Sequence, residues 1–244
     1  MKFATVASGA TALALAFACH LSASPISGTF DIVGNVTATA NSISWTGPNA
    51  PFPPETAVVS SANGSFAAAA GTDVTIKDLN NTQEPVGSFS PQPFITFSVA
   101  GLPSLLINTV YPGLYSSAGC FATPPAVGQT CTPGPPITTA SPFSFQNTQP
   151  PPPDGPQSTA SWVFSGVTAD NSATWRGVFT SQFPVPFQSV LAAFGPGGSG
   201  SVTNSYSATF TVSGTSTVPE PESLFLMLGG LVLVSGSYLK KKLL

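Results

Sequence analysis

Apolar and polar residues alternate along most of the chain between residues 28 and 213. Alternation with a period of two predicts β-strands, because successive side chains of a strand point to opposite faces. The polar partners are mainly serine and threonine, which favours antiparallel sheets with one packed face and one face in water. The clearest apolar series are Phe30, Ile32, Val36 and Ala38; Ile95, Phe97 and Val99; Ala160, Trp162 and Phe164; Trp175 and Phe179; and Tyr206, Ala208, Phe210 and Val212.

Glycine and proline clusters separate these segments. Residues 47–54 interrupt the early strands, and residues 149–155 contain four consecutive prolines, which cannot join a hydrogen-bonded ladder. The sequence therefore predicts an all-β fold over residues 24–213: an antiparallel two-sheet β-sandwich, jelly-roll-like, with about nine to eleven strands. One short helix is expected over Phe187–Phe194, ended by the glycines that follow.

The N-terminus has the features of a secretory signal peptide. Lys2 supplies a positive start, residues 3–18 are apolar or small, and Ala23 offers a small residue for cleavage. We therefore expect residues 1–23 to be removed, and His20, the only histidine, to be removed with them. A lipoprotein site at Cys19 is the weaker alternative, because the leucine usual three residues earlier is missing.

Two cysteines remain after that cleavage, Cys120 and Cys131. An even number of cysteines in an exported protein favours a disulfide, and two free thiols are the alternative. Pro124, Pro125 and Gly128 lie between them and can turn the chain back. Metal binding is not expected, because no histidine or third cysteine is available.

The charge of the chain excludes several functions. Charged residues make up 6% of the sequence, and residues 24–213 hold seven acids against two bases, Lys77 and Arg176. Nucleic-acid binding requires clustered lysine and arginine, so it is excluded. Serine catalysis lacks its histidine base, and no phosphate-binding or dinucleotide-binding loop is present. No cofactor is expected.

The acidic residues leave two open alternatives. A secreted hydrolase would need a pair of carboxylates, but Asp73 and Asp78 are five residues apart in an expected strand, which puts them on opposite faces. Calcium accepts oxygen ligands, although no EF-hand spacing is present. The candidate calcium ligands are Asp73, Asp78, Asn80 and Asn81, or Asp170 and Asn171. The pattern favours solvated acids over both alternatives.

The three tryptophans, Trp45, Trp162 and Trp175, could stack on sugars if they were exposed. Each has apolar neighbours within a strand pattern, which favours a place in the core.

The C-terminal segment has three parts in a fixed order. Pro219, Glu220 and Pro221 form a stiff, extended tripeptide, because each proline fixes its own φ and restricts the residue before it. Residues 224–239 carry no charge and predict a membrane helix roughly 24 Å long. The basic cluster Lys240, Lys241 and Lys242 follows and is expected on the cytoplasmic side.

This order of tripeptide, apolar run and terminal basic cluster resembles the PEP-CTERM protein-sorting signal of Gram-negative bacteria. The resemblance covers about 27 residues and departs in having only lysines in its cluster and two leucines after it. It implies an exosortase-type membrane peptidase as partner and transient anchoring in the inner membrane by residues 214–244. Delivery to the cell envelope or extracellular matrix, with an association with exopolysaccharide, would follow.

Three functions therefore compete. The first is a non-enzymatic surface or matrix protein processed at the sorting signal, which we favour because it requires nothing beyond the observed motifs. The second is a glycan-binding β-sandwich module, which requires aromatic side chains on a wet surface. The third is a secreted hydrolase, which requires two close, buried acids.

Overall fold

Twelve strands and one α-helix make up the computed structural model, which describes residues 25–49, 51, 53–149, 156–195 and 200–215. Residues 25–215 form one unit. The strands are β1 (Gly28–Ala38), β2 (Ser42–Thr46), β3 (Thr56–Ala62), β4 (Asp73–Ile76), β5 (Leu79–Asn80), β6 (Gly87–Phe97), β7 (Leu105–Val110), β8 (Thr130–Cys131), β9 (Ser144–Thr148), β10 (Gln157–Thr168), β11 (Ala173–Phe183) and β12 (Val202–Gly214). The helices are the 3₁₀ turns η1 (Gly64–Ala69) and η2 (Ser117–Phe121) and the α-helix α1 (Phe187–Phe194).

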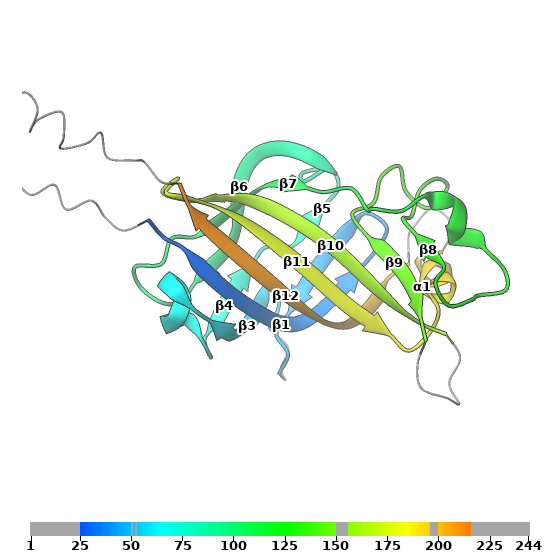
Figure 1. Cartoon of the computed structure of the whole chain (residues 1–244), viewed down its shortest axis with the longest axis horizontal. Coiled ribbons are helices and arrows are strands. Elements are labelled where there is room, and N and C mark those ends of the chain that lie inside the picture. The colour runs from blue at the N-terminus through cyan, green and yellow to red at the C-terminus, as the bar shows by residue number, and fades with distance from the viewer. Residues whose placement is uncertain (1–24, 50, 52, 150–155, 196–199, 216–244) are drawn as a thin grey trace, which may run out of the picture. The chain divides into compact units, whose positions relative to one another are not determined.

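All twelve strands belong to one sheet, and eight of them close into an antiparallel barrel (Figure 1). The circuit runs β11, β12, β1, β3, β4, β6, β7 and β10, and β10 pairs with β11 to complete it. The predicted two-sheet β-sandwich is therefore wrong. The alternation of apolar and polar residues is the same in both folds, since it shows which face of each strand is packed and not which strands pair.

The barrel wall forks at one end. The first half of β1, residues 30–33, pairs with β3, whereas residues 35–38 pair with β2. In the same way, residues 164–168 of β10 pair with β7, and residues 157–161 pair with β9. We call the end with β2 and β9 the forked end. In Figure 1, β8, β9 and α1 lie together there, away from β3 and β4.

Aromatic side chains fill the barrel interior. Phe30 stacks on Phe210 with ring centroids 4.7 Å apart, and Phe94 stacks on Trp175 at 5.7 Å. Phe179 lies within 6.3 Å of six other aromatic rings. An eight-stranded barrel is just wide enough to be filled by side chains. The three tryptophans are all buried here, so the prediction that they belong to the core is confirmed: Trp45, Trp162 and Trp175.

The outer face of the wall formed by β10, β11, β12 and β1 carries hydroxyl groups at alternate positions. Several of them pair across strands. The hydroxyls of Thr37 and Thr203 lie 2.8 Å apart, and Thr209 donates to the carboxylate of Asp31 at 2.6 Å. Cross-strand hydroxyl pairs of this kind stabilise a sheet, so the serine and threonine positions identified by alternation form a polar, almost uncharged wall.

The helix expected over Phe187–Phe194 is confirmed as α1. Its four buried side chains, Phe187, Val190, Leu191 and Phe194, pack over the forked end. Gly195 follows with φ of 70°, a left-handed conformation that glycine adopts without strain and that ends the helix. A small apolar helix therefore covers the part of the barrel interior that the forked wall leaves open.

Within the part of the chain that the structure describes, no helix is long and apolar enough to cross a membrane. The expected membrane helix at 224–239 lies outside the described residues. The expectation of a C-terminal anchor, and of an inner-membrane stage of localisation that depends on it, is corrected accordingly: no anchor helix is found among the described residues.

Candidate functional site

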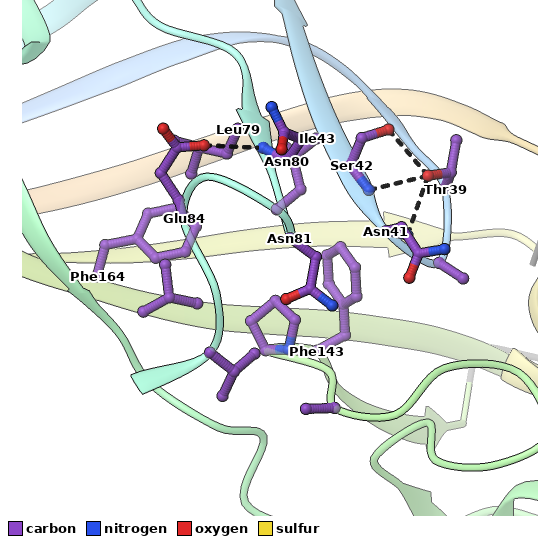
Figure 2. A pocket seen from close by; sticks show the side chains of 15 residues that line it. Thr39, Asn41, Ser42, Ile43, Leu79, Asn80, Asn81, Glu84, Phe143 and Phe164 are labelled. Atoms are coloured by element: carbon purple, nitrogen blue, oxygen red, sulfur yellow. Dashed lines mark hydrogen bonds between the residues drawn. The ribbon is translucent and has the colours of Figure 1, made fainter. Parts of the chain in front are cut away.

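A recess opens at the forked end, between the β2–β5 pair and the segment before β9 (Figure 2). Polar side chains from two turns line one side: Thr39, Asn41 and Ser42 from the first, and Asn80, Asn81 and Glu84 from the second. Apolar residues, Phe143 and Phe164 among them, form the other side. The recess has a volume of about 30 Å³. Ligand pockets usually enclose roughly 300–1,000 Å³, so this recess holds water-sized groups and no sugar ring.

Glu84 is the one acidic residue buried among those described, and it lies beside the recess. Its carboxylate accepts a hydrogen bond from the Lys77 ammonium at 2.5 Å and another from the backbone N–H of Asn80 at 3.1 Å. Lys77 also donates to the side-chain oxygen of Gln92 at 2.6 Å. The buried negative charge is therefore compensated by one cation and one backbone donor, which is the usual requirement for burying a carboxylate. This arrangement holds the turn after β5 against β6.

The other acids considered in the sequence have structural roles or lie exposed. Asp78 lies in the loop between β4 and β5, not in a strand with Asp73, and its carboxylate accepts from the backbone N–H of Trp45 at 2.8 Å. Asp170 accepts from the backbone N–H and hydroxyl of Ser172, and hydrogen bonds from Thr168 and Ser172 lower the pKa of its carboxyl. Asp31 accepts from two hydroxyls on the outer wall.

Among the described residues, no group of three or more His, Cys, Asp or Glu side chains could hold a metal ion. Two of the oxygen ligands considered for calcium lie beside or within turns: Asn80 ends β5, and Asn171 lies between β10 and β11. The Asn80 side-chain oxygen accepts from the backbone N–H groups of Thr82 and Gln83. Asn171 has a positive φ of 56°. Their local roles are those of turn residues.

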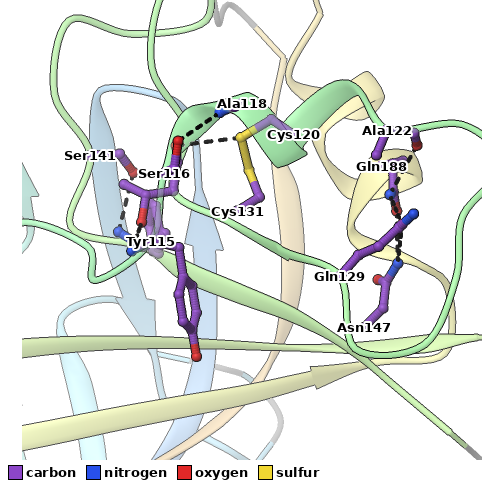
Figure 3. The surroundings of a disulfide bond; sticks show 12 residues. Tyr115, Ser116, Ala118, Cys120, Ala122, Gln129, Cys131, Ser141, Asn147 and Gln188 are labelled. Atoms are coloured by element: carbon purple, nitrogen blue, oxygen red, sulfur yellow. Dashed lines mark hydrogen bonds between the residues drawn. A yellow bond between two sulfur atoms is a disulfide. The ribbon is translucent and has the colours of Figure 1, made fainter.

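The two cysteines form a disulfide within the segment between β7 and β9 (Figure 3). Their Cα atoms lie 4.9 Å apart, and both side chains are buried. Cys120 lies in η2 and Cys131 in β8, so the bond ties a 3₁₀ turn to the short outer strand. We call residues 111–132 the disulfide lobe. The pairing of these cysteines is the one expected from the sequence.

The disulfide lobe is also fixed by hydrogen bonds to the barrel. The backbone N–H of Tyr111 donates to Val163 of β10, and that of Leu114 donates to the hydroxyl of Ser144 in β9. The N–H of Tyr115 donates to the hydroxyl of Thr132 at 2.9 Å. The backbone that precedes η2 is therefore fixed both to the barrel wall and to Thr132, which follows β8.

Three amide side chains join the lobe to the helix, on the right of Figure 3. Gln188 of α1 donates to the side-chain oxygen of Gln129 at 2.7 Å and to the carbonyl of Ala122. Asn147 of β9, which is buried, donates to Gln188 and accepts from the N–H of Phe187, the first residue of α1. The network satisfies buried polar atoms and fixes the lobe against α1.

Large apolar side chains are nevertheless exposed on this fixed lobe. They are Tyr111 at 40% exposure, Leu114 at 81%, Tyr115 at 36%, Phe121 at 60% and Val127 at 51%. We call these five side chains the lobe surface. Tyr115 is seen in Figure 3 with its ring projecting from the lobe. Because side chains of this kind are normally buried, their grouping on one rigid segment marks the lobe surface as the candidate functional site.

The sequence did not identify the lobe surface, because the tryptophans were the expected sugar-stacking residues and they are buried. One signal was available: between Glu84 and Asp154 the chain has no charged residue, yet it contains Tyr111, Tyr115 and Phe121 among glycines and prolines outside any strand pattern.

The remaining residues named from the sequence lie outside the described part of the chain. These are the tripeptide Pro219, Glu220 and Pro221 and the basic cluster Lys240, Lys241 and Lys242. Comparison of the chain with protein-family models, with curated proteins and with solved structures finds no match.

Proposed function

We propose that this chain is an exported, non-enzymatic protein that is processed at its C-terminal sorting signal and acts in association with exopolysaccharide. The observation that carries the proposal is the disulfide between Cys120 and Cys131 in the folded domain. Disulfides form and persist in oxidising compartments outside the cytoplasm. Its presence agrees with the signal peptide that the first 23 residues resemble.

The filled barrel interior supports a non-catalytic role. Aromatic rings fill it, and the carboxylate of Glu84 is compensated by Lys77 and a backbone donor. A general acid or base needs a carboxyl whose proton is free to move near the substrate. The recess beside Glu84 is too small for a sugar ring. A protein that works by presenting its outer surface fits these features better.

Processing is the proposed route to the matrix, with an exosortase-type peptidase as the partner that recognises Pro219, Glu220 and Pro221. The test compares the wild type with Glu220→Ala and with the double variant Pro219→Ala/Pro221→Ala in the source cells. Glu222→Ala is the matched control, because it removes a neighbouring acid outside the tripeptide. Cell fractions are examined by immunoblot and intact mass.

We expect the wild type and Glu222→Ala to yield a shortened protein in the extracellular fraction. Both tripeptide variants should accumulate at full C-terminal length inside the cell. Equal processing of all four proteins would refute a role for the tripeptide.

A further inference from the structure

We infer that the lobe surface, formed by Tyr111, Leu114, Tyr115, Phe121 and Val127, binds a neutral polysaccharide. This inference rests on the proposed association with exopolysaccharide and names the part of the molecule that makes the contact. The five side chains expose apolar area on the one segment that is fixed by a disulfide and by an amide network. Exposed apolar groups held in this way mark interaction sites more often than chance surface residues.

The charge around the lobe selects the class of polymer. From residue 85 to residue 153 the chain has no acidic or basic side chain. In the described part of the chain the basic residues are Lys77, which is paired with Glu84, and Arg176, which lies on β11. An acidic polysaccharide would find no cation on the lobe to compensate its charges. A polymer without charge avoids the large free-energy cost of removing an unpaired charge from water at this surface.

The chemistry of the exposed groups matches a sugar. The faces of aromatic rings are electron-rich, and the C–H groups on a pyranose face carry partial positive charge, so the two stack favourably. A hydroxyl group lies beside one of the rings: the Tyr111 hydroxyl accepts from Ser165 at 3.3 Å on the outer wall. The uncharged hydroxyls of that wall continue the polar surface from the lobe onto β10.

The size of the lobe surface argues against a second copy of the chain as its occupant. If a large side chain carries about 200 Å² in full, the five fractions together expose on the order of 500 Å². A stable protein–protein interface requires roughly 800 Å² from each partner. A sugar chain lying across two or three rings requires much less area and can repeat the contact along its length.

The test is affinity electrophoresis of the purified, oxidised protein in native gels. The gels contain dextran, laminarin, hydroxyethyl cellulose or, as the acidic polymer, alginate. The variants are Tyr115→Ala/Phe121→Ala and Tyr115→Leu/Phe121→Leu, the second of which keeps apolar bulk and removes the rings. Val185→Ala is the matched control, because Val185 is an exposed apolar residue outside the lobe. Thermal melts establish that each variant is folded.

We expect at least one neutral polymer to retard the wild type and Val185→Ala equally. Loss of both stacking contacts should weaken that binding roughly tenfold or more in both double variants. Retardation by alginate alone, equal retardation of the ring-free variants, or no retardation by any neutral polymer overturns the inference. Self-association of the wild type that the variants lose, seen by sedimentation velocity, also overturns it in favour of a second copy. The processing experiment above is independent of every one of these results.

Discussion

Phe179 lies at the centre of the aromatic core. Its ring contacts those of Trp45, Phe94, Trp162, Phe164, Tyr206 and Phe210, all within 6.3 Å. It projects inward from β11, which pairs on both sides with long strands of the wall. A cavity left at this position would border several rigid strands that cannot collapse into it.

Replacing this ring is therefore expected to be costly. Phe179→Ala should lower the free energy of unfolding by about 3–5 kcal/mol, measured by urea denaturation. Phe121→Ala is the matched control, since Phe121 is 60% exposed and should change stability by less than about 0.5 kcal/mol. Equal losses at the two sites would contradict the assignment of core and surface.

Tyr206 places a hydroxyl inside the barrel with no hydrogen-bond partner among the described residues. Burial raises the pKa of this hydroxyl well above its ordinary value of 10.0. Tyr206→Phe removes the unpaired group and should raise the free energy of unfolding at pH 7 by about 1 kcal/mol. Thermal melts of the two proteins at neutral pH measure this difference.

The same side chain predicts a dependence on alkaline pH. Above about pH 10 the unfolded chain releases the Tyr206 proton while the folded chain retains it, so folded stability falls as pH rises. The wild type should lose up to about 1.4 kcal/mol per pH unit relative to Tyr206→Phe in this range. Parallel stability curves for the two proteins from pH 9 to 11.5 would show that the hydroxyl is not buried.

At the scale of elements, the turn after β5 depends on the ion pair between Lys77 and Glu84. Glu84→Gln keeps the shape but removes the charge that Lys77 and the Asn80 N–H both contact. We expect a loss of about 2 kcal/mol in the free energy of unfolding. The control is Asp73→Asn, an exposed acid on the neighbouring β4, for which no change is expected.

The disulfide lobe carries a second element-scale prediction. Removing both sulfurs with Cys120→Ala/Cys131→Ala opens a loop of 11 residues and should lower the free energy of unfolding by about 3 kcal/mol. Reducing agent should lower the stability of the wild type to that of the variant and leave the variant unchanged. A reducing agent without effect on the wild type would show that the bond does not constrain the unfolded chain.

At the scale of the whole molecule, the sequence predicts the parts better than their assembly. Alternation identified the inward face of β10 through Ala160, Trp162 and Phe164, because burial on one face leaves a local record every second residue. The barrel forms because β1 and β12, from opposite ends of the domain sequence, pair with each other and connect the β10–β11 hairpin to the rest of the circuit. That long-range pairing depends on strands meeting in space, and no local pattern records it.

The candidate site shows the same limit. The sequence identified Cys120 and Cys131 because their chemistry needs no fold to be recognised. It did not identify Tyr111 or Phe121 as exposed, because an aromatic residue is expected in the core unless the packing around it is known. The forked wall, which leaves the lobe and α1 to cover one end, is visible only once the register of β1 and β10 is known.

The proposal of an exported protein that is processed at its C-terminal tripeptide has one direct test. The test is the intact mass of the protein recovered from the extracellular fraction of its source cells. We predict a chain that begins at Ser24 and ends near Pro219, Glu220 and Pro221, so that Lys240 to Leu244 are absent. Its mass should be two hydrogens below that of the sequence, because Cys120 and Cys131 are bonded. A protein found only inside the cell, with residues 1–23 and the terminal lysines present and with free thiols at Cys120 and Cys131, would contradict it.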